Sequence, residues 1–426
     1  MRIGRSLAYT LALPLLAGMA AFSNKDRFPD VELTYLFSWL LLFALGVIFV
    51  GSFKYRGPAI AVFIAVVLVR ALLAIAPEIG GLSLVSIALY ALITIVAGAA
   101  LVLKEPILLL RQMYWLSAIS IAISLLQIQG VVWAQEFGSA VDWKVRGDFD
   151  VLFVPYSDDF KFAMTQSRPD GFTHANNLTS QLLMFFYGYA LFLYSFRTGL
   201  PRPPLLWLFV IAFACALTAG KVIVLGILMT HAIAWLVPRK RDWKALLRTL
   251  AVTLAAFALY FVLFPGLFII NFNLDWFIFN AMGRIMNLQS FAGITTFQPL
   301  VDLLSGWYSN KYLDIENPER WLFEEGTVTA EAFSGISFML DYFWIIVPGT
   351  IVGVILLAMS LRRLEGLPVR NLRYLVMIMF CTSVSSVFGG PFVTTVWFLF
   401  FLSFSLIPVT LPYLSTRFKR SIAANR

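Results

Sequence analysis

The sequence predicts an all-α fold: a polytopic integral membrane protein with about twelve transmembrane helices and two long outer loops that contain short helices. Composition is the first reason, because 60% of the 426 residues are hydrophobic and only 13% are charged, whereas soluble domains contain about 25% charged residues. A mean hydropathy of +0.84 is the second. The third is that long apolar runs recur, and backbone groups in lipid are satisfied by helices or closed barrels.

Apolar runs of about twenty residues, the length that crosses a bilayer, define the predicted spans. They lie at approximately 6–22, 33–53, 58–76, 82–103, 107–132, 177–196, 204–219, 221–238, 245–266, 336–361, 372–388 and 391–413. The stretch 204–238 is divided at Ala219-Gly220-Lys221, because a glycine and a lysine interrupt an otherwise unbroken apolar run. The whole chain, 1–426, is therefore expected to form a single transmembrane domain.

The placement of lysines and arginines predicts the orientation of these spans. Basic residues gather at the ends that face the cytoplasm when both termini are inside: Arg2, Arg5, Lys54, Arg56, Lys104, Arg197, Arg202, Arg239, Lys240, Arg241, Lys244, Arg248, Arg362, Arg363, Arg370, Arg373, Arg417, Lys419, Arg420 and Arg426. The short outer loops hold only Lys25, Arg27 and Lys221. This asymmetry explains the net charge of +9 without a nucleic-acid partner. The first 23 residues also resemble a signal peptide, but a retained first helix is the preferred interpretation.

Two predicted outer loops are long, at 133–176 and 267–335, whereas every predicted cytoplasmic loop is short. Most of the 23 acidic residues fall in these two loops. The second loop opens with an aromatic, amphipathic run, "LFIINFNLDWFIFNAMGRIMNLQSF", which is expected to lie along the outer membrane interface as a helix. Long loops in compact proteins are commonly functional, so the chemistry is expected on the outer side.

Several enzyme classes are excluded by the motifs that the sequence lacks. It contains no P-loop, no GxGxxG after a strand, no HExxH and no CxxC pair. Its two histidines, His174 and His231, are far apart in the predicted topology, so neither a His-rich metal site nor another cofactor is expected. Cys215 and Cys381 lie inside apolar runs, which predicts small core residues and no disulfide framework.

Among the cationic side chains that face the outer compartment in this topology, three are candidates for a binding site: Arg168, Lys221 and Arg284. A single cation at a bilayer surface is usually an anchor that reaches the headgroups. Three that converge in an acidic environment would bind an anion, and the planar guanidinium of arginine suits a phosphate. An interfacial anion with an apolar body, such as a lipid-linked pyrophosphate, is therefore the ligand that this arrangement favours.

Arg70 and His231 are ionisable residues that lie well inside the predicted spans. Arg70 lies about two-thirds of the way through its span, where a charge is expensive. We expect it to face the bundle interior or to reach outward, and a substrate contact and a structural role are equally favoured. His231 is expected to be a packed or hydrogen-bonded structural residue. His174 lies beside the outer polar turn, and for it the structural and functional interpretations remain balanced.

The segment "SRPDGFTHANN", residues 167–177, resembles the outer-loop signature of the bacterial O-antigen polymerase and O-antigen ligase family. In that signature an Arg, a Gly and an Asn precede the next membrane helix, here Arg168, Gly171 and Asn176. The segment 217–226 is similar to a second family motif, with Gly220-Lys221 where the family usually has Ser-Arg. Gly283-Arg284-Ile285, followed by Pro299-Leu300 and Ser305-Gly306, resembles a third.

The resemblance implies a GT-C-like membrane glycosyltransferase that works without a metal at the periplasmic face of the bacterial inner membrane. The implied substrate is a glycan on undecaprenyl pyrophosphate, among membrane lipids, and the implied partners are the chain-length regulator and flippase of the same pathway. Arg168 and Arg284 would be catalytic, with Glu331 or Glu325 as the base and Asp170 and His174 as rival bases. Lys221, Gly171, His174, Asn176 and Arg70 would contact substrate.

Two other functions remain as alternatives. Ligases of this family carry a histidine in the second loop shortly before the next span, and "EEGTVTAEAFSGISFMLDYF" contains none, which favours a polymerase. A flippase or transporter of lipid-linked oligosaccharides also fits twelve spans, but it would carry buried charges in several helices and short loops throughout. The two long, one-sided loops favour chemistry outside the membrane.

Overall fold

The computed structural model describes residues 2–22, 32–53, 56–75, 80–131, 133–134, 169–173, 176–218, 221–237, 242–271, 371–387 and 396–410. These residues are overwhelmingly helical, and they contain no β-strand. The helices are α1 (Arg2–Ala21), α2 (Glu32–Ser52), α3 (Arg56–Ile75), α4 (Gly80–Lys104), α5 (Pro106–Ile128), α8 (Asn176–Ser195), α9 (Leu205–Thr218), α10 (Lys221–Leu236), α11 (Trp243–Leu263), α12 (Pro265–Asn271), α19 (Leu372–Val387), α20 (Val396–Ser405) and α21 (Ile407–Thr410). The predicted all-α class is confirmed for this part of the chain.

The helices follow the predicted apolar runs closely. For example, α2 and α8 each begin and end within one residue of the predicted ranges 33–53 and 177–196. The division of 204–238 also stands, because α9 ends at Thr218 and α10 begins at Lys221. The predicted run 336–361 lies outside the described residues, as does most of the second long loop.

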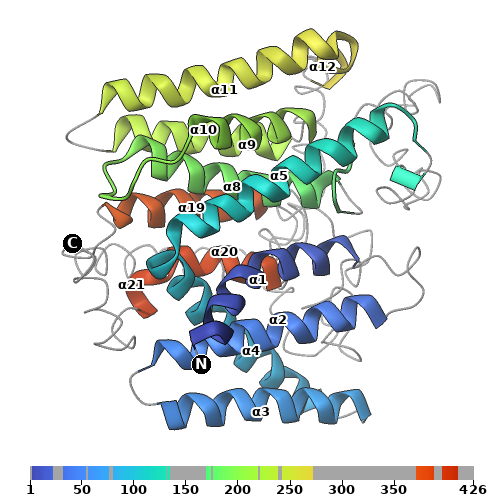
Figure 1. The fold of residues 1–426 in the computed structure, drawn as a ribbon, viewed down its shortest axis with the longest axis vertical. Helices are drawn as coiled ribbons and strands as arrows, with labels where there is room; N and C mark the ends of the chain where they lie inside the picture. Colours follow the sequence, from blue (N-terminus) through green and yellow to red (C-terminus); the bar gives the residue numbers. More distant parts are fainter. Residues whose placement is uncertain are drawn as a thin grey trace, which may run out of the picture.

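Most of the helices lie side by side with their axes roughly parallel, and α5 crosses obliquely over them (Figure 1). One group contains α1 to α4, with α1 packed on α2 and α4 packed on both α2 and α3. A second group contains α5, α8, α9, α10, α11 and α19, in which α9 packs on α5, α8 and α11. Helix α20 joins the groups because it packs on both α4 and α19.

Specific residues set the ends of α5 and α11. Pro106 opens α5, where its fixed φ suits a helix start and its missing N–H is not needed. The predicted end at residue 132 is wrong by four residues, because Gly130 adopts a φ of 75° and reverses the chain after Ile128. Asp242 caps α11 by accepting a hydrogen bond from the backbone N–H of Ala245 at 3.2 Å.

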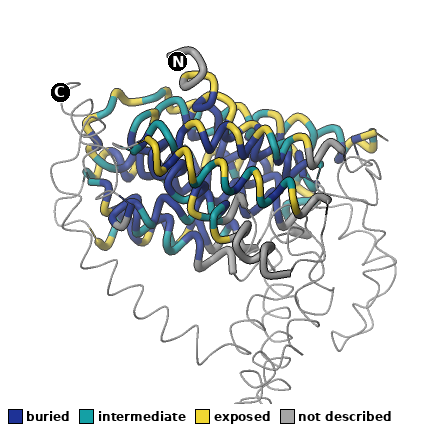
Figure 2. Tube along the Cα trace, turned by 90° about the horizontal axis from the view of Figure 1, so that it is seen from below, coloured by how far each residue is buried: buried dark blue, intermediate teal, exposed yellow. Residues whose placement is uncertain are grey.

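The core consists of closely packed apolar and small residues. Phe401 of α20 stacks on Phe185 of α8, with ring centroids 4.7 Å apart. Gly98 of α4 faces α20 so closely that an added Cβ would lie 2.1 Å from Oγ of Ser403. Small residues at such contacts let helix backbones approach each other. Buried residues run through the middle of the bundle, and exposed residues follow its outer surfaces (Figure 2).

The outer surfaces of several helices are apolar, whereas many hydroxyl and amide groups lie inside. On α3, Ile60, Ile64, Leu68 and Leu72 are exposed at every fourth position, while Arg70 on the same helix is buried. Among the residues that were described in full, two helices, α5 and α11, are long and apolar enough to cross a membrane by length and composition. Continuous exposed apolar surface of this kind marks contact with a partner or with lipid.

Candidate functional site

The structure describes only part of the predicted site. Arg168, His174, Arg284, Glu325 and Glu331 lie outside the described residues. Asn176 and Lys221 are the first residues of α8 and α10, although their side chains are not described. Gly171 and Arg70 are described in full, and they lie in different places: Gly171 contacts α5 and α8, whereas Arg70 lies among α2, α3 and α4.

The turn at residues 169–173 is held against the end of α5 by a side-chain amide. The backbone N–H of Gly171 donates to Oε1 of Gln127 at 3.0 Å. In return, Nε2 of Gln127 donates to the carbonyl of Gly171 at 3.3 Å. Gly171 has a φ of 71°, a left-handed conformation in which a side chain would be strained. The predicted Pro-Asp-Gly turn is therefore present, and both polar groups of its glycine are bonded.

The first turn of α8 holds the other side of this segment. The hydroxyl of Thr179 donates to the carbonyl of Asp170 and lies 2.6 Å from the hydroxyl of Thr173. Because Thr179 uses its proton on Asp170, Thr173 is the donor in the second bond. The turn is thus bonded to α5 on one side and to α8 on the other, and this fixes the backbone that enters α8.

Gln127 is the residue at this site that sequence analysis missed. It is the second-last residue of α5 and is buried, at 8% exposed. Its partner lies 44 residues further along the chain, so no local pattern connects the two. The available signal was a pair of amides, Gln127 and Gln129, near the end of an apolar span just before Gly130.

Arg70 of α3 is buried against polar and aromatic side chains of α2 and α4. Its Nη2 donates to the hydroxyl of Ser38 at 2.6 Å, and its Cζ lies 4.5 Å from the ring centroid of Trp39. The ring of Tyr90 lies on another side, at 6.0 Å. A guanidinium over an aromatic face is stabilised by the ring quadrupole. Arg70 therefore links three helices. The sequence favoured a structural role and a substrate contact equally, and these contacts are those of a structural role.

A hydrogen-bonded network crosses the interior of the second helix group. The hydroxyl of Tyr187 in α8 lies 2.6 Å from Nε2 of His231 in α10 and 2.7 Å from the hydroxyl of Thr253 in α11. All three side chains are buried. The expectation that His231 is a hydrogen-bonded interior residue is confirmed, and Tyr187 is the residue to which it bonds.

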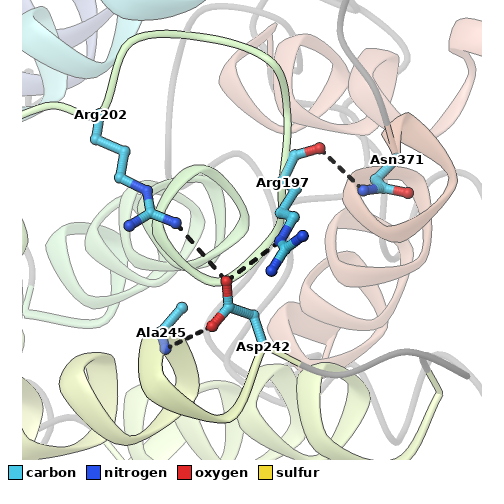
Figure 3. A network of polar contacts seen from close by, with 5 residues as sticks. All are labelled: Arg197, Arg202, Asp242, Ala245 and Asn371. Atoms are coloured by element: carbon cyan, nitrogen blue, oxygen red, sulfur yellow. Dashed lines mark hydrogen bonds and ion pairs between the residues drawn. The ribbon is translucent and has the colours of Figure 1, made fainter.

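The opposite end of the bundle carries a second polar cluster (Figure 3). Oδ2 of Asp242 lies 3.5 Å from Nε of Arg197 and 3.7 Å from Nη2 of Arg202. Nδ2 of Asn371 donates to the carbonyl of Arg197 at 3.0 Å. These contacts bring together the end of α8 and the starts of α9, α11 and α19. The two arginines are largely exposed, so their ion pairs add little stability.

The two ends of the bundle therefore differ in character. One end carries exposed arginines and a capping aspartate, and the other carries the clamped turn between α5 and α8. Within the part of the chain that the structure describes, no three His, Cys, Asp or Glu side chains lie close enough to hold a metal ion. Comparison with known protein families, curated proteins and solved structures finds no match.

Proposed function

We propose that this chain is a polysaccharide polymerase of the bacterial inner membrane. About twelve helices would cross the membrane, with both termini in the cytoplasm and the loops 133–176 and 267–335 in the periplasm. The enzyme would transfer a glycan from undecaprenyl pyrophosphate onto another lipid-linked repeat unit. The observation that carries this proposal is the clamped turn at residues 169–173, which forms a fixed backbone directly after Arg168 in the segment that resembles the O-antigen polymerase signature.

Placement in a membrane is supported by the distribution of polar and apolar side chains. Exposed Ile and Leu side chains on α3, with buried Arg70 behind them, suit a helix with lipid on one face and protein on the other. The lengths of α5 and α11 suit the same environment. Exposed Arg197 and Arg202 at one end fit the cytoplasmic side of the positive-inside rule.

The direction of the helices supports the proposal that the reaction takes place at the periplasmic end of the bundle. Helix α11 begins beside the arginine cluster and ends at the far side of the bundle, beside α12 (Figure 1). Helix α5 ends on that same side, and Gln127 near its end bonds Gly171. The turn therefore lies at the end opposite the arginine cluster, which is the periplasmic end in the proposed orientation.

The reaction would need two kinds of protein group. The bond between the anomeric carbon of the donor glycan and its pyrophosphate breaks, and the departing pyrophosphate keeps the electron pair as negative charge. Arg168, Arg284 and Lys221 would stabilise that charge as it develops. The acceptor hydroxyl attacks the anomeric carbon and loses its proton to a carboxylate, for which Glu331 and Glu325 are the candidates.

The glycan profile of a deletion strain tests this proposal. A polymerase predicts that single-repeat products replace the long chains, and that the wild-type gene restores the long chains. Full-length chains that stay on the lipid carrier would show a ligase instead. Loss of every periplasmic intermediate would show a flippase. Either of these two results overturns the proposal.

A further inference from the structure

We infer that Gln127 is a positioning residue that closes the base of the first long loop and so fixes the backbone that follows Arg168. This inference rests on the proposed function for its catalytic consequence, but the clamp itself is a matter of geometry. The Gln127 side chain bonds the chain on both sides of residues 135–168. Its Nε2 donates to the carbonyl of Ala134 at 3.1 Å and to that of Gly171 at 3.3 Å.

These bonds use both N–H donors of the amide and its oxygen as an acceptor. A glutamine side chain has one carbonyl oxygen and two N–H donors. The oxygen accepts from the backbone of Gly171, and the nitrogen donates to two different carbonyl groups. The side chain is buried, so each of these groups would lose its partner without gaining water if the amide were removed.

The chain folds back over Gln127 because of the turn that ends α5. The backbone N–H of Gly130 donates to the carbonyl of Gln127 at 3.1 Å, and Gly130 adopts a φ of 75°. The N–H of Val131 then bonds Leu126 at 3.0 Å, and the N–H of Ala134 bonds Val131 at 3.0 Å. This reversal brings the carbonyl of Ala134 back to the Gln127 amide.

The two ends of the loop therefore meet at one side chain. Arg168 precedes Gly171 by three residues, and three residues of extended chain span about 10 Å. A clamp on Gly171 thus limits where Arg168 can be placed relative to α5 and α8. Loss of the clamp would let Arg168 depart from the donor pyrophosphate, which would lower kcat because that contact matters most as the bond breaks.

The test compares Gln127→Glu with Gln112→Glu in purified full-length protein. Glutamate has the shape of glutamine but lacks both N–H donors, and its charge would face two carbonyl oxygens. Gln112 is the matched control, because it lies on the same helix, is equally buried, and donates to the carbonyls of Tyr9 and Thr10 at 3.1 Å and 2.6 Å. It bonds α1 rather than the loop.

Two readouts are needed, one of which is independent of the reaction. The first is the rate of limited trypsin cleavage between residues 135 and 168 in detergent, which follows the population of the opened loop. The second is kcat and KM for polymerisation of a lipid-linked repeat unit, per folded molecule. We expect Gln127→Glu to raise cleavage about tenfold and to lower kcat, while Gln112→Glu changes neither. If Gln127→Glu folds poorly, Gln127→Asn replaces it in the test. This variant keeps the amide but shortens its reach, and it should also raise cleavage and lower kcat.

The outcomes separate the inference from the proposed function. Unchanged cleavage in both Gln127 variants, or an equal rise in Gln112→Glu, overturns the clamp. Raised cleavage with unchanged kcat overturns the positioning role, and leaves the polymerase proposal intact. A wild-type protein that does not polymerise overturns the proposed function, and the cleavage rates still decide whether the clamp exists.

Discussion

The backbone N–H of Gly171 lies 3.0 Å from Oε1 of Gln127, although the two residues are 44 positions apart in the chain. This bond joins the turn before α8 to the end of α5. The turn packs so closely there that position 171 requires a glycine. A Cβ at this position would lie 2.6 Å from Oγ of Ser120 and 2.8 Å from Cγ2 of Thr179.

Gly171→Ala should therefore destabilise the protein by about 1–3 kcal/mol, because alanine is strained at positive φ and also collides with its neighbours. Thermal unfolding of the purified protein measures the loss. Gly57→Ala is the control, because a Cβ there would meet nothing within 4 Å. Adding Ser120→Ala should recover only the part of the loss that comes from the collision with the Ser120 hydroxyl, because the collision with Thr179 and the strain at positive φ remain. Equal stability of Gly171→Ala and wild type would show that the turn has a different conformation.

Arg70→Lys should lower the free energy of unfolding by about 1 kcal/mol, because lysine replaces the planar guanidinium over Trp39 with a point charge. Arg56→Lys is the matched control, since Arg56 is exposed at the start of the same helix. The measurement is thermal unfolding combined with KM for the lipid-linked donor. A raised KM with unchanged stability would show instead that Arg70 contacts substrate.

Asp242 should make the stability of the arginine-cluster end depend on pH. The backbone N–H of Ala245, and then Arg197, hold the pKa of this carboxyl below its ordinary value. Its contribution is therefore complete above about pH 4 and is lost as the pH falls through the folded-state pKa. Asp242→Asn should keep the cap but lose less stability than wild type in acid. Asp242→Ala should cost about 1 kcal/mol at neutral pH. An identical acid response of wild type and Asp242→Asn would exclude this role.

Arg168→Ala and Arg284→Ala should each lower the yield of long polymer by about 100- to 1000-fold, which is the usual effect of removing one group that stabilises developing charge. Chain-length analysis at matched protein levels measures the effect. Arg197→Ala and Arg202→Ala are the controls, because these exposed arginines lie at the end of the bundle opposite the clamped turn. Normal polymer from both test variants would remove the two arginines from the mechanism.

The helices were largely predictable because their signals are local. Apolar length placed α2 and α8, and the Gly-Lys pair after Ala219 separated α9 from α10. The end of α5 was not predictable in the same way. Apolar residues resume at Val131 after Gln129 and Gly130, whereas the positive φ of Gly130 and its backbone bond to Gln127 show that the helix has ended.

The candidate site was less predictable because its bonds connect distant residues. The Pro-Asp-Gly signal identified the turn, but no local signal shows that Gln127 bonds it. Arg70 was an ambiguous buried charge until its contacts with Ser38 and Trp39, more than thirty positions away, were seen. The presence of a turn can be inferred from a few neighbouring residues. The side chains that hold the turn in place depend on how separate helices pack.

The most direct test of the central claim is the length distribution of glycans made by the purified full-length protein. The substrate is the lipid-linked repeat unit extracted from a strain that lacks this protein, supplied with EDTA to remove divalent metals. The proposed polymerase should produce a ladder of repeats that remain on the lipid carrier, and EDTA should not shorten it. Repeat units that stay single in the presence of folded wild-type protein would contradict the account.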